Sequence, residues 1–299
     1  MATNSKGKIE ITDLDFDTVK SNFRNFLSQQ SQFSDYNFEG SGMSVLMDLL
    51  AYNTHYLAFH ANMLANEMFL DSTLTRASAV SHAKSLGYTP SSMKSSNATV
   101  NITVSNVPTS QTSLVMAAGT IFNTTVNDIS YQFVTTSDHT ATSDNGIFQF
   151  QNIKIFEGTR VNYTYTVDSN NLEQQFIIPS AAVDTSTLVV SVQNSVSDTT
   201  STTYTLNTDY TTLTSTSTRY FIQEIEEGRF EVYFGDGISG KKPADGNIVT
   251  LSYVVTNGDD ADGASTFVAD STIGGYSSIS VVTVSSASGG GAAETVDSI

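Results

Sequence analysis

The segment from Ser41 to Leu70 constrains the fold of this chain more than any other. Apolar residues recur in it at helical spacing on two adjacent faces. One face carries Leu46, Leu50, Leu57, Leu64 and Met68, and the other carries Val45, Leu49, Tyr52, Tyr56, Phe59 and Met63. An unbroken helix of this length runs about 45 Å, and apolar residues on two faces require neighbours on both sides. The segment therefore favours a role in assembly over one in catalysis.

The residues before and after this segment extend the helical region. Asp15 to Ser28 has the spacing of an amphipathic helix. A third helix is predicted to begin at a cap on Asp71 or Ser72 and to end at Gly87. We therefore predict an N-terminal helical unit over residues 1–90.

From Asn97 onward the hydrophobic period changes to two, which is typical of strands with one buried face. The first example is Ala98, Val100, Ile102 and Val104. Further strands are predicted over residues 120–123, 130–135, 147–156, 161–167, 175–178, 187–192, 220–226, 229–234 and 249–255. The turns between them favour antiparallel pairing.

The predicted fold class is therefore α+β, in which the helical unit precedes two mainly antiparallel β domains. The first β domain is expected over residues 91–170 and the second over residues 171–275, with the break between them within 168–172. Residues 276–299 are rich in Ser and Gly and are predicted to be a linker toward a further C-terminal region.

The charge distribution limits the classes of partner. The formal net charge is -17, and the chain contains no cysteine. Residues 1–95 hold 7 basic and 9 acidic side chains, so that the remainder holds 6 basic and 21 acidic ones. Such a negative surface repels phosphate backbones and acidic lipid headgroups, so we predict binding neither to nucleic acid nor to membranes. The first residues lack the apolar core of a secretory signal, and polar residues interrupt the one long apolar run.

Residues 235–241 resemble part of a phosphate-binding loop. Lys242 and Pro243 follow, whereas such a loop needs Ser or Thr to hold magnesium and a helix to face the phosphate. We therefore interpret Gly235, Asp236, Gly237 and Gly240 as a structural turn between two strands.

Other short motifs also lack the partners that their chemistry needs. The Ser-x-x-Lys matches at 81–84 and 91–94 have no accompanying catalytic motif. An acidic run at 259–262 lacks the remaining ligands of a calcium loop, and the four histidines have no metal-binding spacing. Glu224 and Glu231 could pair as glycosidase acids, but a solvated strand face is favoured. We predict no enzyme, no catalytic residue, no cofactor and no metal.

Two long motifs carry a resemblance to a known family. The run from Phe38 to Ser92 resembles the N-terminal helical region of the baseplate wedge subunits encoded by gene six in T-even-type contractile-tailed bacteriophages, and their cyanophage relatives look especially similar. The run from Phe221 to Ser265, with its FGDG turn and YxxTNG strand, is similar to the wider baseplate J-like family.

The resemblance implies a structural virion protein. Two copies of the subunit would join another wedge protein in each of six wedges, with their helices packed in a core bundle. Neighbouring wedges would form a ring around the tail hub, in contact with hub or sheath-initiator proteins, after assembly in the host cytoplasm. The family's chain continues beyond the position of Ile299, so this chain is a short form, a truncated chain or an ordered part.

The residues expected at intermolecular contacts lie on the two faces of the long helix. They are Leu46, Leu50, Leu57 and Leu64 on one face, and Tyr52, Tyr56, Phe59 and Met63 on the other. Two other functions stay open at this point. The Ser- and Thr-rich strands are compatible with a receptor-binding or fibre-type adhesin, and a tail-associated cell-wall hydrolase is a weaker alternative.

Overall fold

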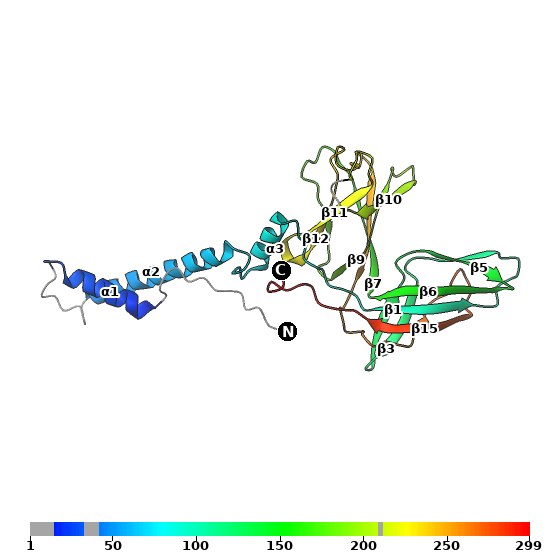
Figure 1. Ribbon diagram of the computed structural model, residues 1–299, viewed down its shortest axis with the longest axis horizontal. Coiled ribbons are helices and arrows are strands. Elements are labelled where there is room, and N and C mark those ends of the chain that lie inside the picture. Colours follow the sequence, from blue (N-terminus) through cyan, green and yellow to red (C-terminus); the bar gives the residue numbers. More distant parts are fainter. Residues whose placement is uncertain (1–14, 33–41, 209–211) are drawn as a thin grey trace. The chain divides into compact units, whose positions relative to one another are not determined.

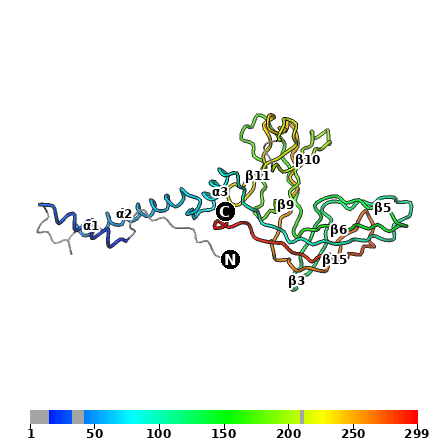
Figure 2. The backbone as a smooth tube through the Cα atoms, viewed as in Figure 1, coloured from blue at the N-terminus to red at the C-terminus, as the bar shows by residue number. Residues whose placement is uncertain are grey.

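The computed structural model describes residues 15–32, 42–208 and 212–299. It contains helices near the N-terminus followed by mainly antiparallel strands, so the predicted α+β class is confirmed (Figure 1). The chain divides into two compact units. One comprises residues 1–88 with 295–299, and the other comprises residues 89–294. Figure 2 traces the backbone through both.

The helical unit contains α1 (Phe16–Ser28), α2 (Gly42–Glu67) and α3 (Arg76–Ser85). Helix α1 begins at Asp15, whose carboxylate accepts hydrogen bonds from the backbone N–H groups of Asp17 and Thr18. Helix α1 lies against α2, where the Phe16 ring meets the His55 ring edge to face at 6.5 Å and Lys20 forms an ion pair with Asp48. The predicted start of α2 at Ser41 lies outside the described residues.

Helix α3 begins later than predicted. Its N-cap is Thr75, whose hydroxyl oxygen accepts a hydrogen bond from the Ser78 N–H at 3.4 Å. The predicted caps, Asp71 and Ser72, lie in the turn after α2, where the Ser72 hydroxyl group donates to the carbonyl oxygen of Asn66. The Ser72 side chain is therefore already used at the end of α2. Gly87 follows the last turn of α3 with a left-handed φ of +75°, which suits glycine.

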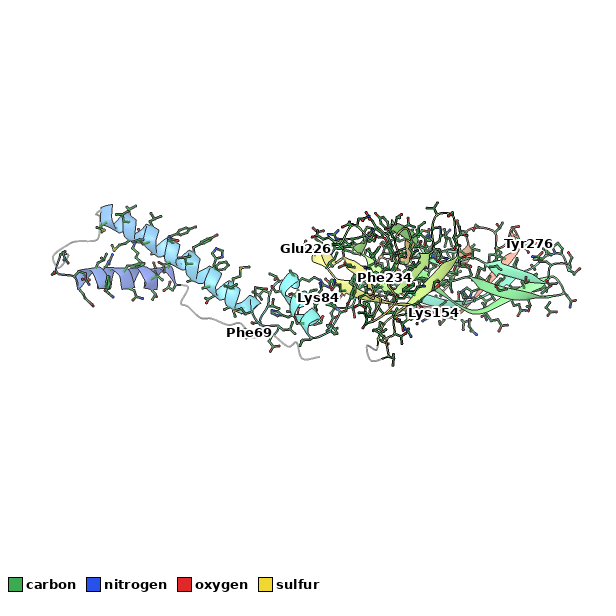
Figure 3. The ribbon with its side chains drawn as sticks, turned by 90° about the horizontal axis from the view of Figure 1, so that it is seen from above. Phe69, Lys84, Lys154, Glu226, Phe234 and Tyr276 are labelled. Carbon is green, nitrogen blue, oxygen red and sulfur yellow. The ribbon has the colours of Figure 1, made fainter. Side chains whose placement is uncertain are left out.

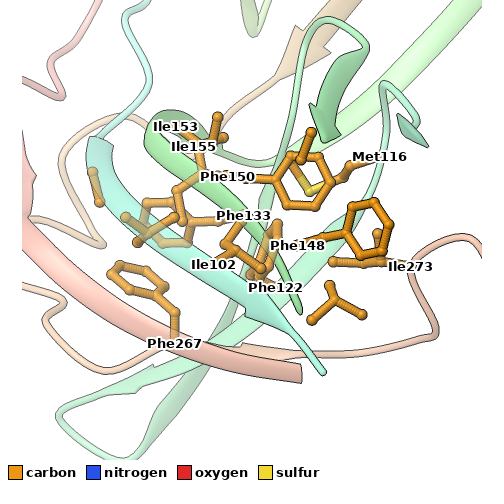
Figure 4. Close-up of a cluster of buried hydrophobic side chains, with 14 of the residues drawn as sticks. Ile102, Met116, Phe122, Phe133, Phe148, Phe150, Ile153, Ile155, Phe267 and Ile273 are labelled. Carbon is orange, nitrogen blue, oxygen red and sulfur yellow. The ribbon is translucent and has the colours of Figure 1, made fainter. Parts of the chain in front are cut away.

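The first sheet has the strand order β14-β3-β4-β6-β1-β15, and β5 and β2 extend it beside β6. All of its pairs are antiparallel. Its strands are β1 (Asn97–Val104), β2 (Ser113–Met116), β3 (Ile121–Val126), β4 (Ile129–Val134), β5 (His139–Asp144), β6 (Ile147–Glu157), β14 (Val268–Ala269) and β15 (Ile279–Ser288). The inward side chains form an aromatic-rich core that includes Phe122, Phe133, Phe148 and Phe267 (Figure 4).

The second sheet has the strand order β7-β13-β9-β10-β11-β12-β8. Only the short β10–β11 pair is parallel among its described strands. Its strands are β7 (Thr159–Thr166), β8 (Phe176–Ile178), β9 (Val183–Gln193), β10 (Ser201–Leu206), β11 (Arg219–Glu224), β12 (Phe230–Phe234) and β13 (Ile248–Val255), and a 3₁₀ turn at Glu226–Gly228 joins β11 to β12. The two edge strands approach each other, because the Tyr165 hydroxyl group on β7 donates to the carbonyl oxygen of Ile177 on β8 at 2.6 Å. The sheet therefore curls around its own apolar core.

The two sheets do not divide the chain at the predicted boundaries. Strand β7 belongs to the second sheet although it precedes residue 170, and β14 returns to the first sheet. The predicted linker over 276–299 is wrong where β15 pairs with β1 along its length. Ile279 and Val281 on β15 pack against the first core, and the serines elsewhere in this strand hid the alternation in the sequence.

Candidate protein interface on helix α2

Helix α2 buries only a narrow stripe of mostly small side chains. The buried residues are Met47, Ala51, Ala58, Asn62, Ala65 and Asn66. At 3.6 residues per turn they all lie on one side of the helix. Small side chains allow close approach of a neighbouring backbone, but they remove little apolar area from water. The stripe therefore leaves most of the apolar surface of α2 uncovered.

The two apolar faces that the sequence predicts both lie in solvent. Their side chains are between 43% and 69% exposed. The leucine face consists of Leu46, Leu50, Leu57, Leu64 and Met68, and the aromatic face consists of Val45, Leu49, Tyr52, Tyr56, Phe59 and Met63. Helical geometry places the centres of these two faces and of the buried stripe about 120° apart. Figure 3 shows side chains projecting from more than one side of this helix.

The rings on the aromatic face contact one another and the neighbouring His60 ring. The rings of Tyr52 and Tyr56 stack at a centroid distance of 6.4 Å, and the ring of His60 meets that of Tyr56 edge to face at 4.4 Å. Phe59 also contacts His60, at 5.8 Å. These ring contacts restrict the side chains before any partner arrives, which lowers the entropy lost on binding.

The exposed apolar surface continues beyond α2 along the helical unit. Phe69 and Leu74 lie in the turn that follows α2, and Leu86 lies at the end of α3, and all three are more than half exposed. Soluble monomers rarely expose so many large apolar side chains on one helical unit, because the exposed area is unfavourable in water. The surface therefore has the properties of a protein–protein interface.

The turn between α2 and α3 is held by Glu67. The Glu67 carboxylate accepts hydrogen bonds from the hydroxyl groups of Thr73 and Thr75 at 2.6 and 2.7 Å, and from the backbone N–H groups of Leu74 and Thr75 at 3.0 and 3.2 Å. Partial burial by itself raises the pKa of Glu67, but these bonds and the Ser78 hydroxyl group outweigh it and lower the pKa to about 2. The ionised carboxylate thereby fixes the direction in which α3 leaves α2.

Residues 235–240 form a turn after β12. The Asp236 carboxylate accepts hydrogen bonds from the N–H groups of Ile238 and Ser239 at 2.9 and 2.8 Å, and these bonds lower its pKa. Gly237 and Gly240 have φ angles of +94° and +102°. A Cβ atom on Gly235 would lie 2.4 Å from the backbone of Gly240, so the chain approaches itself too closely for a side chain there.

The other chemical motifs stay apart in the structure. Glu224 lies opposite Phe230 and Glu231 lies opposite Gln223, so the two carboxylates point to opposite sides of the sheet. Asp262 accepts a hydrogen bond from the Ser96 hydroxyl group instead of joining an acidic cluster. In the ranges that the structure describes, no group of three His, Cys, Asp or Glu side chains could hold a metal, and no helix is long and apolar enough to cross a membrane.

Glu157 carries a buried carboxylate whose role is not visible in the sequence. Its side chain is 1% exposed. Its carboxylate accepts hydrogen bonds from the Thr256 hydroxyl group at 2.6 Å and from the backbone and side-chain N–H groups of Asn257 at 3.0 and 2.7 Å. The TNG sequence at 256–258 was the available signal, but the residue that it binds lies 99 positions earlier.

Comparison with known proteins places these features in a class. Residues 15–88, which contain the three helices and the exposed faces of α2, match the helical domain of gp6-like baseplate wedge proteins. The match ends at residue 88, before the first strand of the β region.

A particular relative extends the likeness into the β region. The chain is 29% identical over 270 residues to the baseplate wedge protein gp6 of Enterobacteria phage T4, which covers 83% of this chain. It spans about two fifths of the length of that relative, since the alignment covers 39% of it. The predicted resemblance to a baseplate wedge subunit is thus confirmed.

Proposed function

We propose that this chain is a structural subunit of the baseplate wedge of a contractile phage tail, and that α2 joins it to other subunits. The observation that carries the proposal is the exposure of both apolar faces of α2 within a region that matches the gp6-like helical domain. The similarity to a baseplate protein supports a role in assembly rather than in catalysis. The tail baseplate of the virion is the corresponding location.

The size of the exposed surface fits an obligate interface. Burying a large apolar side chain contributes about 1.5–3 kcal/mol. The eleven side chains of the two faces are roughly half exposed, so their burial offers on the order of 10 kcal/mol. Association itself opposes binding by about 4–15 kcal/mol, so a stable complex requires both faces or additional contacts. A single weak contact through one face would leave the other face in water.

The division of α2 into two faces supports two separate packing partners. In this proposal one partner is a second copy of the chain and the other is a different wedge protein, which together with α2 form a helical bundle. Wedges of this kind then join as a six-fold ring around the tail hub, with hub or sheath-initiator proteins nearby, after assembly in the host cytoplasm.

The experiment is co-assembly of the full chain with the other wedge proteins of the same phage. Leu50→Asp with Leu57→Asp should abolish the complex, because an unpaired charge in a desolvated interface costs several kcal/mol. Tyr56→Asp with Met63→Asp tests the aromatic face in the same way. The matched control is Val196→Asp with Ile238→Asp, which places the same charges at apolar positions that are 81% and 78% exposed in the β unit.

Native mass spectrometry and size-exclusion chromatography report the outcome. Loss of the complex in the α2 variants but not in the control supports the proposal, provided that the circular dichroism of each variant matches that of the wild type. Normal assembly of both α2 variants contradicts it. A trimer with affinity for glycans would favour the adhesin instead, and lysis of peptidoglycan would favour the hydrolase.

A further inference from the structure

The chain crosses between the two sheets of the β unit twice, and a third segment contacts both sheets. Residues 92–96 lead into β1 of the first sheet, after contacts with the start of β9 in the second. Residues 157–159 join the end of β6 to the start of β7. Residues 256–258 leave β13 and lead back toward β14. A hinge between the sheets would have to bend both crossings and break the contacts of residues 92–96 with β9.

These three segments are hydrogen-bonded to one another in every pairing. Glu157 binds Thr256 and Asn257 through its carboxylate, as described above. The Glu157 N–H donates to the carbonyl oxygen of Ser96 at 2.8 Å. The Ser96 N–H donates to the carbonyl oxygen of Gly258 at 3.2 Å. We call Ser96, Glu157 and residues 256–258 the junction.

A second buried carboxylate binds residues 92–96 to the second sheet. Asp184 on β9 is 2% exposed and accepts hydrogen bonds from the N–H and hydroxyl groups of Ser95 and of Ser186. The Thr185 N–H also donates to the Ser92 hydroxyl oxygen at 3.0 Å. The donors to both carboxylates are uncharged hydroxyl, amide and backbone groups, so each carboxylate depends on all of its hydrogen bonds to remain buried.

The backbone is also packed tightly at the junction. Gly158 has a φ angle of +120°, and a Cβ atom there would lie 2.1 Å from the carbonyl oxygen of Val255. The Thr256 hydroxyl group is used twice, since it donates to Glu157 and accepts from the Gly258 N–H at 3.0 Å. Rotation of one sheet relative to the other would therefore break several short contacts at once.

We propose that the junction fixes the two β sheets as one rigid body, with Glu157 as the residue that positions the two crossings and the segment 92–96. The chain then has no hinge between its sheets. This inference does not depend on the proposed function, because it concerns the chain by itself.

The test measures the distance between the two sheets in the full chain. The chain contains no cysteine, so Gln149→Cys on β6 and Thr203→Cys on β10 give one exposed labelling site in each sheet. Pulsed electron paramagnetic resonance between spin labels at these sites should show one narrow distance distribution. Glu157→Gln and Asn257→Ala should broaden it, and they should speed hydrogen exchange of the backbone N–H groups in 256–258 by about tenfold or more.

Two substitutions at Thr256 distinguish the loss of a junction hydrogen bond from general damage to the fold. Thr256→Ser keeps the hydroxyl group and should retain the narrow distribution, whereas Thr256→Val keeps the shape and should broaden it. Glu173→Gln, at an exposed loop position, is the matched control for Glu157→Gln. A broad or double distribution in the unmutated junction overturns the proposal, and this result needs no variant to fold. A distribution that stays narrow in Thr256→Val and Asn257→Ala also overturns it.

Discussion

The Glu67 carboxylate accepts the hydroxyl hydrogen of Thr75 at 2.7 Å, so the last residue of α2 is bonded directly to the N-cap of α3. The same Thr75 hydroxyl oxygen accepts from the Ser78 N–H and so begins the next helix. One ionised side chain thus connects the end of one helix to the start of another. The exposed face of α2 and the exposed Leu86 at the end of α3 owe their relative direction to this turn.

Glu67→Gln is expected to destabilise the helical unit in a pH-dependent way. The pKa of Glu67 in the folded chain is about 2, below its ordinary value of 4.5. Its contribution is therefore present above about pH 4.5 and is lost as the pH falls toward 2. We expect a loss of about 1 kcal/mol at pH 7, since solvent near the carboxylate screens the interaction. Thermal unfolding followed by circular dichroism at 222 nm measures it.

The control for this prediction is Glu173→Gln, whose side chain lies at an exposed loop position. The difference in unfolding free energy between Glu67→Gln and the wild type should shrink between pH 4.5 and pH 2. A difference that stays constant over this range would show that the carboxylate charge has no part in holding the turn.

A second prediction separates the buried stripe of α2 from its exposed faces. Ala51 is fully buried, whereas Leu57 is 62% exposed. Ala51→Leu should overpack the stripe and destabilise the isolated chain by about 1–3 kcal/mol. Leu57→Ala should change the stability of the isolated chain by less than about 0.5 kcal/mol, because it removes no buried contact. Chemical denaturation of each variant tests both values.

In the assembled state the ranking of these two variants by severity should be reversed. Leu57→Ala should weaken co-assembly with the wedge partners although the isolated chain is unaffected. If Leu57→Ala destabilises the isolated chain as much as Ala51→Leu does, the leucine face is covered within the chain, and the division into buried and exposed faces is wrong.

A third prediction concerns two glycines with left-handed backbones in different surroundings. Gly158→Ala should cost about 3 kcal/mol or more, because its Cβ atom would lie 2.1 Å from the carbonyl oxygen of Val255 in addition to the backbone strain at φ +120°. Gly246→Ala places a Cβ atom in open space at φ +76°, so only the strain of about 1 kcal/mol remains. Urea denaturation followed by tyrosine fluorescence compares them. Equal losses would show that the junction can relax around a side chain.

The parts of the fold that the sequence predicts are those set by local periodicity. The alternation in β1 and the two apolar faces of α2 are visible in single segments, and the structure places the first in a sheet and the second in solvent. The start of α3, by contrast, depends on hydrogen bonds to residues of α2. Ser72 is a suitable cap by type, but its hydroxyl group is bonded to Asn66, and Thr75 becomes the cap through Glu67.

Long-range pairing explains the remaining differences. The serines of β15 are typical of a linker, and only its partner β1, more than 170 residues earlier, shows that it is a strand. Glu157 is similarly unremarkable in the sequence, since its role comes from Thr256 and Asn257. The sequence favours a solvated strand face for Glu224 and Glu231, which is wrong because both side chains are buried. The register of β11 and β12 places them on opposite sides of the sheet.

The last prediction concerns the tyrosines of the second core at high pH. Burial raises the pKa of Tyr204, Tyr253 and Tyr165, and it raises that of Tyr220 to about 12. The neutral phenol is therefore favoured in the folded chain, and the stability that these groups provide is complete below their ordinary pKa of about 10. It decreases as the pH rises from about 10 to about 12, because the unfolded chain ionises first. We expect the second sheet to unfold in this range.

Tyr220→Phe tests the contribution of one tyrosine to this loss of stability at high pH. It removes an ionisable group that should contribute about 2 kcal/mol to the pH dependence between pH 10 and 12, so the alkaline unfolding midpoint should move upward. Tyr52→Phe, at an exposed position on α2, is the control and should leave the midpoint in place. The exposed tyrosines should ionise first, and the later rise in tyrosinate absorbance at 295 nm should coincide with the change in circular dichroism at 218 nm, because buried phenols ionise when the sheet opens. Ionisation of all tyrosines near pH 10 with the sheet intact would mean that the second core is open to water.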